Sequence, residues 1–466
     1  MPAGVATNRR VGLTKPSYPD TKVEVCAAIF QFMNRHVTPV EASLHPSIQK
    51  SPGDIAENPS GKTLYLHHGP ATRSGGTSHA RPADVTVHRA TTEHEREAIY
   101  RLRYHVYIEE MNGANRHHEA NSKNQQLRDA WDDCAHHFYA VHQGTVVACA
   151  RFIMRRNGPL ECEEHFNLER FAPSYPDSVG MTSRLALHPQ HRGSHLLKQL
   201  TCAIYQFLRE ERIQFNFIDC HTRLLPLYSK LGFRAYRPGF NHAQYTYVVP
   251  MVLVVDDLEF LEQVKSPFVP VARLYPSSLN GRHLLLSQFP DAATVLVPPS
   301  HKPAHSTDLM LERLIQADQS ASSNMLHGLM MEDVTVLASL GHYVSCQIGD
   351  AVLRAGDPGR DIFLILDGRF QVTGRFRHTP DDEVQVSKTL TAGDVFGEIR
   401  FLTDEIRYAS VVALERSTLL VLNAKAMDRL VITAPKVAAK VFRNIARIVV
   451  SRLCPANDFP PGPSSP

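Results

Sequence analysis

The sequence predicts an α+β protein with two ordered units, a mixed α/β domain followed by an antiparallel β-roll that ends in a helix. The first observation is a change of period: apolar residues alternate over 179–187 and then recur at helical spacing over 196–208. The second is a series of short strand-like runs separated by glycines at 349, 356, 359, 368 and 393, which is typical of a small roll. The third is length, because 466 residues with 43% hydrophobic content suffice for two or three cores.

The composition argues against several classes of function. The formal net charge is only +3 at pH 7 and no basic helix-turn-helix is visible, so we expect no nucleic-acid partner. The longest apolar stretches fall short of the roughly 20 residues that span a bilayer, and no charged-then-apolar leader opens the chain. We therefore expect a cytoplasmic protein without a membrane span. The eight cysteines form no CxxC pair, which favours a reduced setting, and we expect no metal ion.

Shifts in composition divide the chain. The first residues are rich in Pro, Ser, Thr, His and Gly, which favours disorder, and a proline cluster at 298–303 interrupts a later helix-like pattern. The expected divisions are a mostly disordered arm over 1–84, a first domain over 85–257, a connector over 258–324, a second domain over 325–455 and a disordered tail over 456–466.

The first domain opens with a helix. Thr92 and Glu95 form a capping-box pattern, and Ile99 and Leu102 lie on the apolar face that follows. Arg103 shares that face. Because an unpaired buried charge costs on the order of several kcal/mol, Arg103 needs either a carboxylate of the protein or a ligand, and both alternatives remain open.

Strands are predicted over 137–141, 146–153 and 179–187, and a helix follows the polar loop Gln190–His195. The first turn of that helix offers backbone N–H groups to an anion, with Arg192 and Gly193 beside it. An ordinary strand-to-helix loop would have the same pattern. A second short helix over 226–231 ends at Gly232 and carries Tyr228.

Together these two stretches resemble the GCN5-related N-acetyltransferase (GNAT) family. The loop pattern Gln/Arg-x-x-Gly-x-Gly/Ala is matched by Gln190, Arg192 and Gly193, whereas His195 stands at the last small position. The resemblance implies that Tyr228 protonates the departing thiolate. It also implies that the acyl donor contacts Leu185, Leu187, Gln190, His191, Arg192, Gly193, Ser194 and His195.

A narrower resemblance covers about 85–257. The run Arg103-x-x-x-Tyr107, followed by Asp129-x-x-Asp132, Arg151 and Arg184, resembles the acyl-homoserine-lactone synthases and the related N-acyl amino acid synthases. It implies that the donor is a thioester of CoA or of acyl carrier protein, which makes the carrier a candidate partner. It also implies a substrate pocket at Arg103, Tyr107, Arg151 and Arg184. Leu127 and Met181 occupy positions where the lactone synthases have glutamates.

The residue types suit a small zwitterion. A carboxylate holds an ammonium group, and arginine clasps a carboxylate with two hydrogen bonds. Attack on a thioester requires the free amine, so a carboxylate must take a proton, and Asp129 and Asp132 are the candidates. We therefore expect an amino acid or similar small amine as acceptor. Two alternatives remain: a protein-lysine acetyltransferase, and a non-catalytic docking module, for which Met181 and His195 argue.

The second unit carries its own motif. Phe396-Gly397-Glu398, with Arg407 nine residues after the glutamate, resembles the phosphate-binding cassette of cyclic-nucleotide-binding domains, and 435–453 resembles their C-terminal helix. The resemblance implies cAMP or cGMP as effector, with Arg407 on the phosphate and Glu398 on the ribose. The implied contacts are Phe396, Gly397, Glu398, Ile399, Arg400, Arg407, Tyr408 and Ala409. Arg400 and Tyr408 replace small residues, so a purely structural roll is the alternative.

Overall fold

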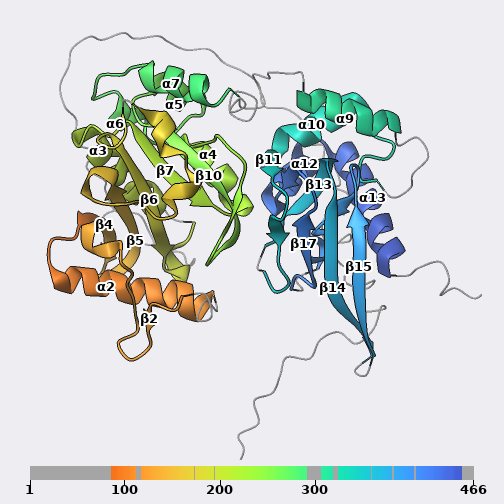
Figure 1. The fold of residues 1–466 in the computed structure, drawn as a ribbon, viewed down its shortest axis with the longest axis horizontal. Coiled ribbons are helices and arrows are strands. Elements are labelled where there is room, and N and C mark those ends of the chain that lie inside the picture. Colours follow the sequence, from red (N-terminus) through yellow and green to blue (C-terminus); the bar gives the residue numbers. More distant parts are fainter. Residues whose placement is uncertain are drawn as a thin grey trace, which may run out of the picture.

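The computed structural model describes residues 85–111, 117–172, 174–193, 195–290, 306–317, 324–357, 359–379, 382–403 and 406–453. The arm expected over 1–84 and the tail expected over 456–466 lie outside these ranges. The described part forms the two expected units, a mixed α/β domain and a β-roll (Figure 1).

The first domain is built on one twisted sheet with the order β1-β4-β5-β6-β7-β10-β8, and β9 pairs with β10. Its strands are β1 (Val85–Arg89), β4 (His136–His142), β5 (Thr145–Met154), β6 (Val179–Leu187), β7 (Phe215–Cys220), β8 (Arg234–Ala235), β9 (Phe240–His242) and β10 (Thr246–Val254). Helix α2 (Glu93–Arg103) begins at the predicted capping box and continues into a π-helix, η2 (Tyr104–Glu110). Helices α3 (Leu196–Glu210) and α4 (Leu225–Leu231) follow β6 and β7.

Opposite faces of this sheet carry different helices. Helix α2 packs on the face that includes Tyr139 and Cys149, because Ile99 and Leu102 share a core with them. Helices α3 and α4 cover the other face, where Ile218 belongs to the core. The alternation of side chains along each strand therefore sorts the residues of β6 and β7 between the two faces.

The centre of the sheet is interrupted. Strands β6 and β7 run parallel and pair over only three residue pairs, from Val179 with Phe215 to Met181 with Phe217. Beyond these pairs β6 contains a β-bulge, where the register with β5 shifts and Arg184 adopts φ +52°. The parting of β6 and β7 leaves an opening at the carboxyl ends of two neighbouring parallel strands, where α/β folds commonly bind ligands.

The expected connector packs on both neighbours. Its helices are α5 (Leu258–Gln263), α6 (Val269–Ala272), α7 (Asn280–Gln288) and α9 (Ser306–Ala317). Phe268 stacks on Tyr205 of α3, with ring centroids 4.6 Å apart, whereas Leu311 and Leu314 of α9 belong to the core of the second unit.

The second unit consists of two four-stranded antiparallel sheets, β11-β18-β13-β16 and β12-β17-β14-β15. Its strands are β11 (His342–Cys346), β12 (Ala351–Leu353), β13 (Ile362–Asp367), β14 (Phe370–Thr379), β15 (Asp382–Leu390), β16 (Val395–Phe396), β17 (Ala409–Ala413) and β18 (Ser417–Leu422). Its helices are α10 (Met331–Leu340), α11 (Glu398–Leu402), α12 (Ala424–Thr433) and α13 (Pro435–Leu453). The predicted apolar face of α13, including Val441 and Ile445, is buried in the core. The expected roll with its C-terminal helix is confirmed.

The two domains share an interface in which β9 and β10 face β11 and β12 (Figure 1). Tyr247 of β10 donates its hydroxyl to the Ser345 carbonyl oxygen at 2.8 Å, and the backbone N–H of Ala351 donates to Asn241 Oδ1 at 3.1 Å. Buried apolar residues on both sides, among them Val249 and Val352, belong to one continuous core. The interface is therefore packed as well as hydrogen-bonded.

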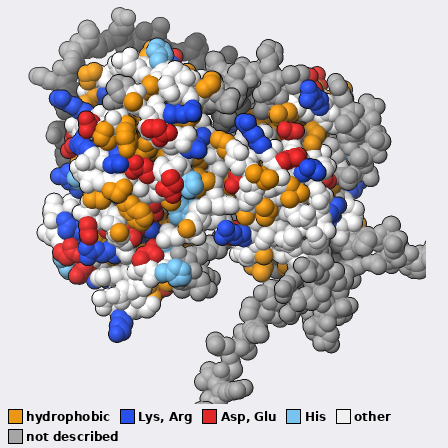
Figure 2. Space-filling view, in the orientation of Figure 1, with side chains coloured by type: hydrophobic (Ala, Val, Ile, Leu, Met, Phe, Trp, Pro, Cys, Tyr) orange, Lys and Arg blue, Asp and Glu red, His pale blue; other side chains and the backbone are white. Residues whose placement is uncertain are grey.

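Within the described ranges, no helix combines the length and apolar character needed to cross a membrane. The same residues contain no group of three or more His, Cys, Asp and Glu side chains that could share a metal ion. On the face shown in Figure 2, acidic and basic side chains are interspersed and do not form a field of one sign.

Candidate functional sites

The buried Arg103 is paired within the protein. Its Nη1 donates to Asp132 Oδ1 at 2.7 Å and its Nη2 to His137 Nδ1 at 3.1 Å. Arg151 of β5 donates from Nη1 to the same Asp132 oxygen at 3.0 Å. Of the two alternatives for Arg103, the structure shows the internal ion pair.

This pairing determines what Asp132 can do. Burial alone would raise the pKa of Asp132, but the charges of Arg103 and Arg151 outweigh burial and hold that pKa well below its usual range. The Asp132 side chain is 0% exposed. A carboxylate so strongly held in its ionised form, and so enclosed, is a weak proton acceptor.

Asp129 joins the other two arginines. Its Oδ1 accepts a short hydrogen bond from Arg151, and its Oδ2 accepts from Arg184 Nε at 3.0 Å and Nη2 at 2.7 Å. Glu161, which the sequence reasoning did not single out, accepts from Arg151 Nη2 at 2.8 Å. The arginines predicted to bind a substrate carboxylate are therefore bound to carboxylates of the protein.

Asp129 also borders a cavity. The cavity has a volume of about 480 Å³ and is lined by Glu119, Asn121, Gln126, Arg128, Asp129 and Ala130. Its wall combines the carboxylates of Glu119 and Asp129 with the guanidinium of Arg128, so both signs of charge face the same space. Of the predicted substrate and catalytic residues, Asp129 is the one that lines this cavity.

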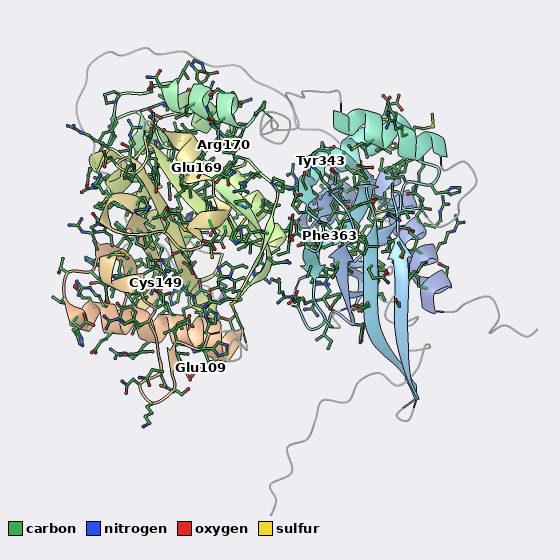
Figure 3. The ribbon with its side chains drawn as sticks, viewed as in Figure 1. Glu109, Cys149, Glu169, Arg170, Tyr343 and Phe363 are labelled. Carbon is green, nitrogen blue, oxygen red and sulfur yellow. The ribbon has the colours of Figure 1, made fainter. Side chains whose placement is uncertain are left out.

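The bulge in β6 is fixed by Tyr107. The Tyr107 hydroxyl donates to the Leu185 carbonyl oxygen at 3.0 Å, and burial raises the pKa of Tyr107 to about 12. Arg184 Nη1 donates to the Tyr245 hydroxyl at 2.9 Å, and Cys149, labelled in Figure 3, lies beneath the bulge with its Sγ 3.9 Å from the Arg184 carbonyl oxygen. Tyr107 thus holds the bulge that contains the predicted donor residue Leu185.

The predicted donor loop lies at the start of α3. Pro189–His191 forms a 3₁₀ turn, Gly193 has φ +79°, and α3 begins at Leu196 after His195. Arg192 is engaged by Glu110 of η2, with hydrogen bonds of 2.5 and 2.6 Å, and by the Leu187 carbonyl oxygen at 3.2 Å. Gln190 and His191 lie in the 3₁₀ turn, and Ser194 lies outside the described residues.

Tyr228 of α4 and Asp219 of β7 lie near the point where β6 and β7 part, since Asp219 and Tyr107 both act electrostatically on Tyr228. Burial raises the pKa of Tyr228 well above its usual value, so its hydroxyl keeps the proton that a departing thiolate would take. Asp219 is the second residue beyond the last β6–β7 pair, and the sequence reasoning missed it. A single acid inside the apolar strand Phe215–Cys220 was the signal that could have identified it.

In the roll, the hydrogen bonds of the Arg407 guanidinium to described residues go to backbone oxygens. Its Nη1 donates to the Gly397 carbonyl oxygen at 2.6 Å and its Nη2 to the Asp361 carbonyl oxygen at 2.8 Å. Burial lowers the pKa of Arg407 to about 10, although the charges of Asp361 and Glu398 act in the opposite direction. Gly397 has φ +86°, and a Cβ there would lie 2.7 Å from Arg407 Nη1, so the close approach requires glycine.

The remaining predicted cassette residues surround α11. Phe396 stacks on Phe363, labelled in Figure 3, with ring centroids 4.8 Å apart. Ile399 and Arg400 lie on α11, and Ala409 begins β17 directly after Tyr408. Glu398 Oε1 accepts a hydrogen bond of 2.8 Å from Arg452 of α13, so the residue expected to bind the ribose contacts the C-terminal helix in this structure.

Comparisons with known proteins agree with this division. Residues 102–201 match the family model for the acetyltransferase (GNAT) domain, and residues 343–433 match that for the cyclic nucleotide-binding domain. The chain is 28% identical over 171 residues to the cAMP-dependent protein kinase regulatory subunit of Schizosaccharomyces pombe. That alignment covers 34% of this chain, and the chain spans about 40% of the length of that relative.

Solved structures resemble each domain separately. The catabolite activator protein of Thermus thermophilus is 27% identical, with 28% of this chain and 57% of that chain covered and a TM-score of 0.24. A CoA-dependent acyl-homoserine lactone synthase is 19% identical, with 41% of this chain and 99% of that chain covered and a TM-score of 0.33.

Proposed function

This chain joins a GNAT-type acetyltransferase domain to a cyclic nucleotide-binding domain, and on that premise we propose that it is an N-acyltransferase under cyclic-nucleotide control. The donor is an acyl thioester of CoA or of acyl carrier protein, and the acceptor is an amino acid or similar small amine. One observation carries the proposal: β6 and β7 part beside a bulge, with Tyr228 at the opening and a charged cavity near it.

The chemistry follows from this arrangement. The amine nitrogen attacks the thioester carbonyl carbon, a C–N bond forms, and the C–S bond breaks. Backbone N–H groups near the bulge suit the developing oxyanion, and the Tyr228 hydroxyl gives its proton to the departing sulfur. The loop before α3 supplies backbone N–H groups for the phosphates of the donor. Arg192 lies in the same loop and contacts those phosphates only by exchanging its partner Glu110 for them.

The cavity supports a zwitterionic acceptor. Glu119 and Asp129 suit an ammonium group. Arg128 pairs with the exposed Asp133 and, at 3.8 Å, with Glu93, so it binds a substrate carboxylate only by exchanging these partners. The pairing of Arg151 and Arg184 with protein carboxylates favours one rival, since a protein-lysine acceptor needs only the carboxylates. The acceptor thus distinguishes the two enzymatic functions.

The deciding experiment supplies the purified chain with acyl-CoA and acyl-carrier-protein donors, together with a pool of amino acids or lysine-containing peptides, with and without cAMP or cGMP. Mass spectrometry should detect N-acyl amino acids and a yield that changes with the nucleotide. Acylated peptides alone would establish the lysine acetyltransferase. If no donor gives an acylated amine, the non-catalytic sensor is the better description.

A further inference from the structure

The carboxylates near the bulge differ in their partners. Asp132, Asp129, Glu161 and Glu119 each approach a guanidinium group within salt-bridge distance. Asp219 does not approach any described arginine that closely. The Asp219 contact that the structure shows is with His242, whose Nε2 lies 3.8 Å from Oδ2. A carboxylate without a cationic partner is the one among these that binds a proton most readily.

Asp219 lies on the face of the sheet opposite the one that α3 and α4 cover. It follows Phe217 by two residues on β7, so the two side chains share a face, the one that packs against Phe166 and Met181. Its neighbour Cys220 lies on the other face, in the core that Tyr228 packs against. Asp219 and Tyr228 therefore approach the opening between β6 and β7 from opposite faces.

The Asp219 side chain is 14% exposed, so it is enclosed but reachable. The ionisable groups that influence it or that it influences are Glu161, Cys162, Arg184, Cys220, Tyr228 and Tyr245, together with the nearby His242. Burial lowers the pKa of His242 to about 4, so this imidazole is neutral at pH 7 and places no positive charge beside the carboxylate.

We propose that Asp219 is the general base of the acyl transfer, taking the proton from the acceptor ammonium group before the amine attacks the thioester. The inference rests on the proposed function. The first proton passes from the ammonium nitrogen to Asp219 Oδ before attack. After attack the Tyr228 hydroxyl gives its proton to the departing thiolate, and the second proton that nitrogen loses in becoming an amide passes through solvent to re-protonate Tyr228. The C–N bond forms as the C–S bond breaks, so the step is complete without oxidant or metal.

The acidity of this group fits the role. Burial and the charge of Glu161 raise the pKa of Asp219 to about 7, against the opposing effects of its own backbone N–H and of Arg184. A base is most effective when its pKa lies near the working pH, because it is then both ionised and basic. Asp132, held in its ionised form by two arginines, lacks that property.

The test compares wild type, Asp219→Asn and Asp256→Asn, using octanoyl-CoA with a mixture of the twenty amino acids as probes. Asp256 is another carboxylate whose pKa burial raises, and it lies outside the site, beyond the end of β10. Asp219→Asn should lower kcat by about 100-fold or more, which is typical for loss of a general base. In wild type, kcat should rise with pH through about pH 7 as Asp219 ionises, and this rise should be absent in Asp219→Asn. Asp256→Asn should keep both the rate and the rise.

Two further readouts separate catalysis from structure. With hydroxylamine as acceptor, an amine largely unprotonated at neutral pH, the Asp219→Asn defect should be much smaller. Wild type should lose thermal stability relative to Asp219→Asn as pH rises from 5 to 8. The folded-state pKa of Asp219 is raised above the ordinary value of 3.8, so ionising this buried group disfavours folding.

The outcomes are distinguishable. If wild type transfers acyl groups and Asp219→Asn keeps the rate and the rise with pH, this inference fails while the proposed function stands. If the defect is equal with hydroxylamine, or the stability difference does not grow with pH, Asp219 has a structural role and the inference also fails. If wild type makes no acylated amine with any donor, both the inference about Asp219 and the proposed function fail.

Discussion

Arg151 and Arg407 are both buried, with 0% and 4% of their surfaces exposed, but they have different kinds of partner in the two domains. Arg151 contacts the carboxylates of Asp129, Asp132 and Glu161, and these outweigh burial and raise its pKa. Arg407 contacts backbone carbonyl oxygens, and burial lowers its pKa. The first charge is already neutralised by the protein, whereas the second is available to an anionic ligand.

The comparison shows why an arginine pattern alone does not identify a binding site. A buried guanidinium has a large desolvation cost that some anion must offset. In the GNAT-type domain that anion is supplied by the chain, and Arg151 and Arg184 hold Asp129, which lines the cavity. In the roll the dipoles of two carbonyl groups offset only part of the cost, and a cyclic phosphate would supply the rest.

The largest expected effect is on the stability of the acyltransferase domain. Arg151→Met should lower its free energy of unfolding by about 3 to 5 kcal/mol, because three buried carboxylates lose a shared partner. Arg96→Met, which breaks an exposed pair with Glu93, is the control and should cost less than about 1 kcal/mol. Chemical denaturation at pH 7 measures both.

The stability that these buried ion pairs contribute also depends on pH. The pKa of Asp132 is held below the unfolded value of 3.8, so the stability it contributes is fully present above that pH and is lost as the pH falls below it. The difference between wild type and Arg151→Met should therefore shrink below about pH 4. A difference that stays constant down to pH 3 would mean that the arginine stabilises by packing alone.

The second effect is on ligand binding. Arg407→Gln should weaken cAMP and cGMP binding by about 100-fold or more, because charge-assisted hydrogen bonds to the phosphate are lost. Unlike Arg151→Met, it should leave the stability of the unliganded protein nearly unchanged, since none of the described carboxylates forms a salt bridge with Arg407. Calorimetry and thermal unfolding give the two readouts, with Arg369→Gln as the exposed control. Wild-type binding weaker than millimolar would favour the structural roll.

Local elements of the fold were predicted from the sequence, whereas the pairing of buried charges was not. The strand over 179–187, the capping box at Thr92 and the helix over 435–453 were predicted because local periodicity and capping chemistry specify them. Arg407 was proposed from a compact motif, and the structure adds that one of its two backbone partners, Asp361, lies 46 positions away. The pairing of Asp129 with Arg184 joins residues 55 positions apart, and periodicity does not say which buried charges meet. Glu161 and Asp219 were missed for the same reason.

A smaller effect concerns an ion pair that Glu398 of the cassette forms with α13. Arg452 of α13 binds Glu398, the carboxylate expected to accept the ribose hydroxyl, and both side chains are partly or largely buried. Arg452→Met should therefore tighten cyclic-nucleotide binding by about 1.5- to 5-fold, the range of a partly exposed pair. Arg447→Met, on the exposed face of the same helix, should change nothing. Weaker binding in Arg452→Met would show that Arg452 contacts the nucleotide instead.

The last expected effect concerns the link between the two regions. Asp361 accepts a hydrogen bond from Arg407 through its backbone oxygen and another from Thr222 Oγ1 through its carboxylate, at 2.7 Å. Thr222 lies in the segment just before α4, and α4 carries Tyr228. Asp361 therefore joins Arg407 to that part of the first domain. Because one hydrogen bond contributes about 0.5 to 1.5 kcal/mol, Thr222→Val should reduce the ratio of rates with and without cAMP by about 2- to 10-fold. Basal turnover and nucleotide affinity should change less than this ratio, and Thr222→Ser, which keeps the hydroxyl, should restore the response. A full response in Thr222→Val would place the coupling instead in the packed contact between β10 and β11, where Tyr247→Phe removes the hydrogen bond to Ser345 and tests that route.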